Sequence, residues 1–235
     1  MSPSAGTRSG ERSPAAAPLL GASLAQAVAL LLLWRGAEAE AAFAVSPLPA
    51  VPLWTLVLIV PLQFLLLAGL GVPRRLGAGL AASVVLLLVA SAWTGRQLEP
   101  GAEIRAGAVL GRYAFLITLA AFLGTVWLHP LIANRRPDPA ALHAASWRSF
   151  LLPLQALVLA GLLGAVLALW AGLFRLVGIG FFAELFTEDW FLFPVLGLAF
   201  GIGVVLFRRR PELLGGLDDR LRLAMLLLLP LVLAI

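Results

Sequence analysis

Three carboxylates in one connecting segment, Glu184, Glu188 and Asp189, are the residues of this chain best placed to do chemistry. Carboxylate oxygens are the ligands that hard cations such as Ca²⁺ and Mg²⁺ prefer, so a metal site is one interpretation. The other is structural, because Glu188 and Asp189 precede an apolar run that begins at Trp190, and negative charge stabilises the positive end of a helix. We favour the structural interpretation. We predict no catalytic residue, no cofactor and no metal, and an enzyme acting through these three acids ranks last among the alternatives.

Other reactive side chains are missing from the sequence. All 17 basic residues are arginine, so no lysine can form a Schiff base, and no cysteine is present to act as a nucleophile or metal ligand. His129 is the one His, Asp, Glu, Lys or Arg residue inside the six complete expected membrane spans, and it lies near a span end. The chain has no GxSxG, HExxH or Walker motif. An intramembrane protease, a proton-driven transporter and an ATPase motor would each lack their central residues.

The composition indicates a membrane protein. Of 235 residues, 61% are hydrophobic and only 12% are charged, and the mean hydropathy is +1.00. Soluble domains carry about a quarter charged residues. Too few polar residues are available to cover a soluble core, so lipid must solvate much of the surface. We therefore predict an all-α fold, a polytopic bundle of transmembrane helices.

Uncharged runs long enough to cross about 30 Å of hydrocarbon define the expected spans. Six runs reach this length, and a seventh ends on apolar residues without a polar flank, as if a helix were cut short. Residues 1–17 are then an N-terminal tail, 18–235 form a single transmembrane domain, and 173–189 form an amphipathic segment in the outer interface. The expected spans lie near 18–34, 51–71, 76–95, 113–133, 149–172, 190–207 and 217–235.

The arginines predict the orientation. With the N-terminus in the cytoplasm, twelve of the 17 arginines fall in inside segments, as the positive-inside rule requires. This asymmetry explains the sequence pI near 11.3 without a nucleic-acid partner. All seven tryptophans fall near expected span ends, where indole rings sit at the headgroup level. We predict a bacterial inner membrane protein. A cleaved signal peptide is the alternative interpretation of the first apolar run.

One inside segment carries a strong helix-start signal. Asp138 followed by Pro139 is typical of an N-cap and first helical position. We expect a short helix on the cytoplasmic surface from there through Trp147 and Arg148, and a kink at Pro153 where the fifth span begins.

Small residues indicate where helices touch, because they let two backbones approach closely in a membrane. Gly161, Ala165, Ala168 and Gly172 form a stripe along the fifth span, and Gly197 and Gly201 form a GxxxG pair on the sixth. We predict that these residues pack helices together, with spans five and six forming a hairpin.

The stretch from Leu169 to Phe207 resembles a known family. The residues that carry the resemblance are Trp170, Leu173-Phe174, Gly178-Ile179, Phe181-Phe182, Leu185-Phe186, Pro194-Val195, Gly197-Leu198 and Phe200-Gly201. Their spacing is similar to that in an uncharacterised family of bacterial multi-pass membrane proteins, described only as a domain of unknown function. The resemblance implies that this chain is the N-terminal part of a longer protein with more spans, and it implies no site residues.

Two functions remain. The first is a structural or accessory membrane subunit that acts through helix packing, with the lipid bilayer and a membrane-protein partner or a second copy of itself as its contacts. The alternative is a transporter or channel for a neutral or lipidic substrate, which predicts a polar cavity around Gln63 and Gln155.

Overall fold

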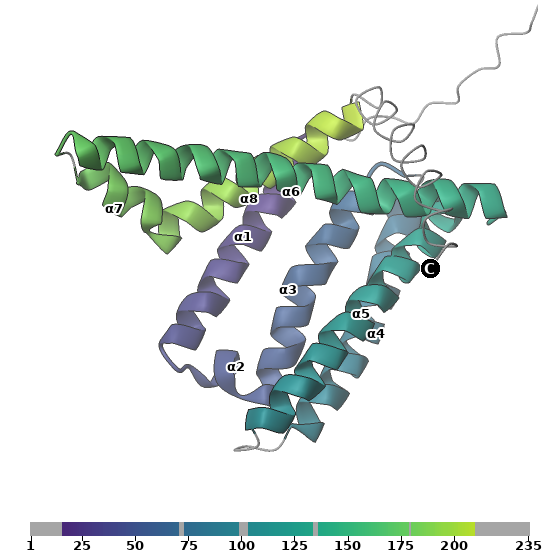
Figure 1. Cartoon of the computed structure of the whole chain (residues 1–235). Coiled ribbons are helices and arrows are strands. Elements are labelled where there is room, and N and C mark those ends of the chain that lie inside the picture. The colour runs from purple at the N-terminus through teal and green to yellow at the C-terminus, as the bar shows by residue number, and fades with distance from the viewer. Residues whose placement is uncertain (1–15, 71–72, 99–102, 134–135, 179, 210–235) are drawn as a thin grey trace, which may run out of the picture.

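The computed structural model describes residues 16–70, 73–98, 103–133, 136–178 and 180–209 (Figure 1). Every regular element within these residues is an α-helix, which confirms the predicted all-α class. The expected seventh span near 217–235 and residues 1–15 of the expected tail lie outside the described residues. The helices are α1 (Ala16–Glu38), α2 (Ala42–Val45), α3 (Pro47–Leu67), α4 (Pro73–Gln97), α5 (Glu103–Ile132), α6 (Pro139–Leu176), α7 (Phe181–Thr187) and α8 (Asp189–Arg209).

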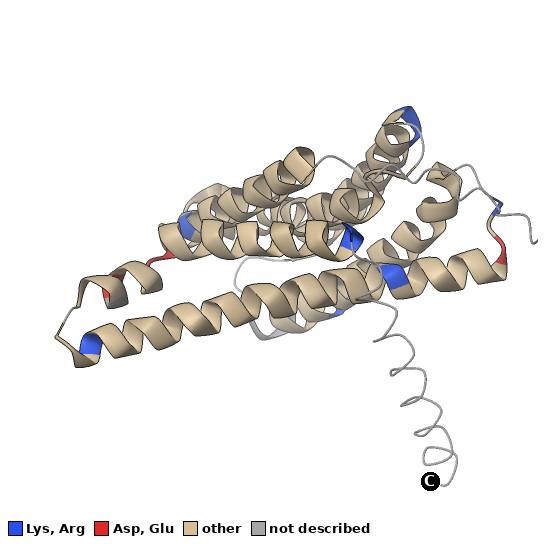
Figure 2. Ribbon diagram, turned by 90° about the horizontal axis from the view of Figure 1, so that it is seen from above, with Lys and Arg blue, Asp and Glu red and all other residues tan. Residues whose placement is uncertain are grey.

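Six of these helices, α1, α3, α4, α5, α6 and α8, are long and apolar enough to cross a membrane. Their outward surfaces carry large apolar side chains, with Leu86 at 72%, Phe115 at 68% and Leu162 at 61% exposure. Figure 2 shows long uncharged lengths of helix between the charged residues. Because no described residue covers this apolar surface, lipid is the environment that it fits.

Proline and a capping aspartate mark where several helices begin. Pro47 and Pro73 open α3 and α4, at positions where a missing N–H breaks no helical hydrogen bond. At the start of α6 the Asp138 carboxylate accepts a hydrogen bond from the Ala141 backbone N–H at 2.6 Å, and Pro139 occupies the first turn. The predicted cap is confirmed.

The prediction of a separate surface helix before Pro153 is wrong. Helix α6 runs without a break from Pro139 to Leu176, a length of 38 residues, or about 57 Å. Neighbouring helices make proline tolerable inside a membrane helix, which explains how α6 continues through Pro153. Figure 1 shows α6 running across one end of α1, α3, α4 and α5.

The core lies where four helices meet. Leu19 of α1, Leu65 of α3, Leu152 of α6 and Val204 of α8 are almost completely buried in one cluster. Around it, α3 packs against α1 and α4, and α8 packs against both α1 and α6. Helix α8 is thus held between the first helix of the chain and the long helix α6.

Stacked aromatic rings hold the connection from α6 to α8. Phe174 at the end of α6 stacks on Phe182 of α7, with ring centroids 4.4 Å apart. Phe186 of α7 stacks in turn on Phe191 of α8 at 5.6 Å. Gly178 makes the turn between α6 and α7 with φ +82°, a conformation that glycine adopts without strain. The rings therefore fix where α7 and the start of α8 lie.

Candidate functional site

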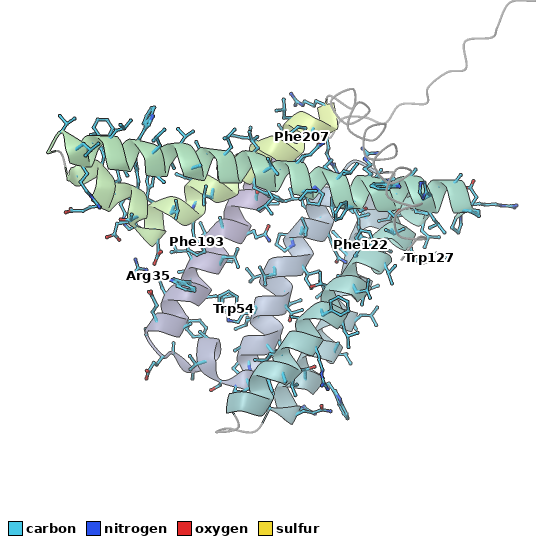
Figure 3. All side chains as sticks on the ribbon, in the orientation of Figure 1. Arg35, Trp54, Phe122, Trp127, Phe193 and Phe207 are labelled. Atoms are coloured by element: carbon cyan, nitrogen blue, oxygen red, sulfur yellow. The ribbon has the colours of Figure 1, made fainter. Side chains whose placement is uncertain are left out.

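The acidic residues at the start of α8 surround an arginine. Arg35, in the last turn of α1, lies 3.9 Å from a carboxylate oxygen of Glu188, 3.9 Å from one of Asp189 and 3.5 Å from one of Glu38 (Figure 3). The Arg35 side chain is about half exposed. Exposed pairs of this kind contribute about 0–1 kcal/mol each. The cluster therefore orients the two helix ends more than it stabilises them.

Glu184, the third acid of the predicted cluster, stands apart. It is exposed on α7, and within the described residues it forms no ion pair. The described part of the chain holds no group of three or more His, Cys, Asp or Glu placed to hold a metal ion. Glu188 and Asp189 instead form ion pairs with Arg35. The sequence argument did not connect Arg35 with these acids, although all three residues fall on the same expected side of the membrane.

A second arginine joins the far end of α8 to α3. The guanidinium of Arg208 donates hydrogen bonds from its two terminal nitrogens to the backbone carbonyls of Leu66 and Ala68. Carbonyls in the last turn of a helix have no partner within the helix, and a cation there also interacts favourably with the helix dipole. Arg208 thus caps the C-terminal end of α3.

These two arginines define the relative directions of three helices. The end of α1 meets the start of α8 at Arg35, so the two helices run antiparallel. The ends of α3 and α8 meet at Arg208, so these two run the same way. Successive membrane crossings require this alternation of α1, α3 and α8.

The GxxxG pair of α8 faces α1. A β-carbon added to Gly197 would lie 2.3 Å from the Cβ of Ala27, and one added to Gly201 would lie 2.7 Å from the Cβ of Ser23. The Ser23 hydroxyl donates a hydrogen bond to the Gly197 carbonyl at 2.8 Å. Only glycine leaves room for this approach, which is the use of small residues that membrane helices make.

A different glycine of α8 faces α6. Helices α6 and α8 do pack together, but their close contact is made by Gly203, where an added β-carbon would lie 2.9 Å from the Cα of Ala156. Two residues along a helix turn the side chain by about 200°, so Gly201 and Gly203 face opposite ways. Their opposite directions let α8 pack tightly on both sides.

The small-residue stripe of α6 points away from α8. Gly161, Ala165, Ala168 and Gly172 are all exposed. A β-carbon added to Gly161 or Gly172 would meet nothing within 4 Å. Within the described residues, then, neither glycine of the stripe is in close contact with another helix. The packing role of the stripe stays a prediction.

A polar network joins α3, α4 and α5 in the bundle. The buried carboxamide of Gln63 accepts a hydrogen bond from the Ser83 hydroxyl at 2.6 Å and donates to the Ala121 carbonyl at 3.3 Å and the Thr125 hydroxyl at 3.4 Å. Gln63 has partners at both ends of its amide, as a buried polar group requires. It therefore acts as a cross-link between three helices.

Gln155 differs from Gln63. Its side-chain oxygen is buried on α6 and has no hydrogen-bond partner among the described residues. Such an oxygen costs about 1–3 kcal/mol unless something outside the chain satisfies it. Neither glutamine lines either of the two cavities described below, although the transporter alternative predicted a polar cavity around them.

An apolar cavity of about 560 Å³ lies between α2, α3 and α5. Inside it the hydroxyls of Thr55 and Tyr113 are 2.9 Å apart. A smaller cavity of about 290 Å³ lies beside Gln26 and Pro61. The sequence argument missed the larger cavity, although Tyr113 is the only tyrosine of the chain and stands at the start of an otherwise apolar run.

Comparison with protein-family models, with curated proteins and with solved structures finds no match to this chain in any of the three.

Proposed function

We propose that this chain is a structural or accessory membrane subunit, which binds a transmembrane helix of a partner or of a second copy along the exposed small-residue stripe of α6. The support is the exposure of Gly161, Ala165, Ala168 and Gly172, all on one helix face and none used within the described chain. Lipid tails need no small residues opposite them, whereas a partner helix does. This stripe is the observation that carries the proposal.

The small-residue stripe of α6 differs from the small residues of α8 in what it contacts. On α8 the same kind of residue, at Gly197, Gly201 and Gly203, is used for packing against α1 and α6. The contrast supports reading the α6 stripe as an unoccupied packing surface of the same type. The resemblance to the uncharacterised membrane family is compatible with the proposal and adds no activity to it. The proposed setting is a bacterial inner membrane, with the N-terminus in the cytoplasm.

Native gel electrophoresis of membranes solubilised in mild detergent tests the proposal. The wild-type chain should migrate as a complex larger than its monomer, and the double variant Gly161→Leu/Gly172→Leu should migrate as the monomer. Gly111→Leu is the matched control, because Gly111 is also an exposed helical glycine with nothing within 4 Å of an added β-carbon. A wild-type chain that runs only as a monomer, or a double variant that keeps the complex, overturns the proposal.

The transporter or channel for a neutral substrate is the second candidate, and the buried oxygen of Gln155 without a partner favours it. A substrate or water in a transport path would supply that partner. Since the chain has no cysteine, a single Gln155→Cys variant can be probed with a small water-soluble thiosulfonate. Reaction from either side of native membranes supports a transport path, and absence of reaction from both sides contradicts it.

A further inference from the structure

The cavity between α2, α3 and α5 has the size and walls of a ligand site. Its volume of about 560 Å³ falls within the range of about 300–1,000 Å³ that small-molecule pockets occupy. Apolar side chains such as Val51, Trp54, Ile59 and Ile117 make most of its lining (Figure 3 labels Trp54). Among the described lining residues none carries a charge. A charged ligand group would lack a counter-charge there, so the cavity suits a neutral molecule.

The polar groups of the cavity indicate what that molecule must offer. The Thr55 hydroxyl donates its one proton to the Val51 carbonyl at 2.7 Å, because a carbonyl oxygen can only accept. The Tyr113 hydroxyl, 2.9 Å from Thr55, must therefore donate its own proton to the threonine oxygen. The phenol oxygen of Tyr113 keeps its lone pairs and has no proton left to give. A ligand that complements it brings a hydrogen-bond donor.

The opening of the cavity lies on the apolar surface of the bundle. Val45, Leu58 and Leu110 line it and are 49%, 48% and 38% exposed. Thr55 follows the start of α3 at Pro47 by eight residues, about 12 Å along the helix. This depth is within one leaflet of a hydrocarbon core about 30 Å thick. A ligand entering here comes from the lipid phase and brings its polar group about 12 Å along α3 from the helix start, toward the middle of the bilayer.

We propose that this cavity binds a neutral lipid with a free hydroxyl group, of the diacylglycerol type, whose hydroxyl donates a hydrogen bond to Tyr113 while its chains occupy the apolar walls. The site lies on α3 and α5, away from the α6 stripe, and does not depend on the subunit function proposed above.

Equilibrium binding to the full chain in phosphatidylcholine nanodiscs tests the site. The probe is radiolabelled dioctanoylglycerol, and the competitor is the acetyl ester of its free hydroxyl, which has the same chains and no donor. The wild-type protein should prefer the free hydroxyl by about tenfold, the value of one neutral hydrogen bond. Phosphatidic acid, which is charged, should compete poorly.

The variant Thr55→Val/Tyr113→Phe keeps the shape of the cavity and removes the hydroxyls of Thr55 and Tyr113. It should bind both lipids with equal affinity, so the tenfold preference disappears. Thr94→Val is the control, because Thr94 makes the same bond to a carbonyl one turn back, to Ala90 at 3.0 Å, and does not line the cavity. Ala114→Phe, which fills the cavity, should abolish binding of both lipids.

Two results overturn the inference: wild-type protein that binds neither lipid, or a double variant that retains the preference for the free hydroxyl. The complex seen in native gels should be the same for wild type and Thr55→Val/Tyr113→Phe, so failure of the lipid site and failure of the subunit proposal are separate outcomes.

Discussion

Gly201 of α8 approaches Ser23 of α1 so closely that a β-carbon added to the glycine would lie 2.7 Å from the serine Cβ. Real Cβ atoms do not come this near to one another, so one of the two backbones would have to move. The serine contributes a hydrogen bond as well as its small size, because its hydroxyl donates to the carbonyl of Gly197 one turn earlier. The contact joins the first and the last of the described helices and so closes the bundle.

Replacing Gly201 with leucine should destabilise the protein. A larger side chain in a closely packed contact costs about 1–3 kcal/mol, and here it would push α8 away from α1. The measurement is the melting temperature of the purified protein in detergent. Gly21→Leu on α1 is the control, since nothing lies within 4 Å of a β-carbon added there. Equal melting temperatures for the two variants would contradict the α1–α8 contact.

Arg208→Ala should destabilise the protein more than Arg209→Ala. Arg208 donates to the carbonyls of Leu66 and Ala68, and hydrogen bonds to a charged group contribute about 1.5–3 kcal/mol. Arg209 is the exposed neighbour of Arg208, and the Arg209→Ala variant removes the same charge from the same end of α8. Melting temperatures of the two variants make the comparison. A similar fall in melting temperature for both variants would mean that the positive charge at the end of α8, and not the cap on α3, provides the stability.

The stability of the protein should depend little on the ion pairs between Arg35 and the acidic residues at the start of α8, and it should not depend on metal. Arg35→Ala should cost less than about 1 kcal/mol, because its partners Glu188 and Asp189 are solvent-accessible. Millimolar Ca²⁺ should leave the melting temperature of the wild-type protein unchanged. A Ca²⁺-dependent rise that Glu188→Gln abolishes would favour the metal interpretation instead.

The two glutamines should give opposite results when each is replaced by leucine. Gln63→Leu removes the acceptor of the Ser83 hydroxyl and a donor to Thr125, so it should lower stability by about 1–3 kcal/mol. Gln155→Leu removes a buried oxygen without a partner among the described residues, so it should raise the melting temperature. A fall for Gln155→Leu would show that its oxygen is hydrogen-bonded in the membrane.

The sequence predicts the helices well and their contacts poorly. A helix that crosses the bilayer needs an uncharged run as long as the bilayer is thick, so the positions of the charges predict six helices long and apolar enough to span it. The start of α6 follows from the local chemistry of Asp138 and Pro139. A membrane helix is apolar on all sides, however, so no hydrophobic face indicates which neighbour it meets. Apolarity alone therefore does not predict the pairing of Gly201 with α1.

Sequence patterns within one segment also failed to predict features that depend on packing between helices. The sequence predicts a short surface helix that ends before Pro153, yet α6 continues through this residue. Arg35 and Glu188 are far apart in the sequence, and only the antiparallel packing of α1 and α8 brings them together. Thr55 and Tyr113 meet across α3 and α5 in the same way. A small-residue pair such as Ser23 and Ala27, four residues apart on α1, is the one signal that could have indicated the partner of α8.

We infer that all six long, apolar helices cross the bilayer in alternating directions, including α6, which runs across one end of α1, α3, α4 and α5 (Figure 1). Labelling of single cysteines at 140 and 177, at the two ends of α6, with a membrane-impermeant maleimide tests it most directly, because the chain has no cysteine of its own. In intact cells position 177 should react, and position 140 should react only after the membrane is opened. Reaction of both positions from the same side would mean that α6 lies along the membrane surface, and would contradict the claim.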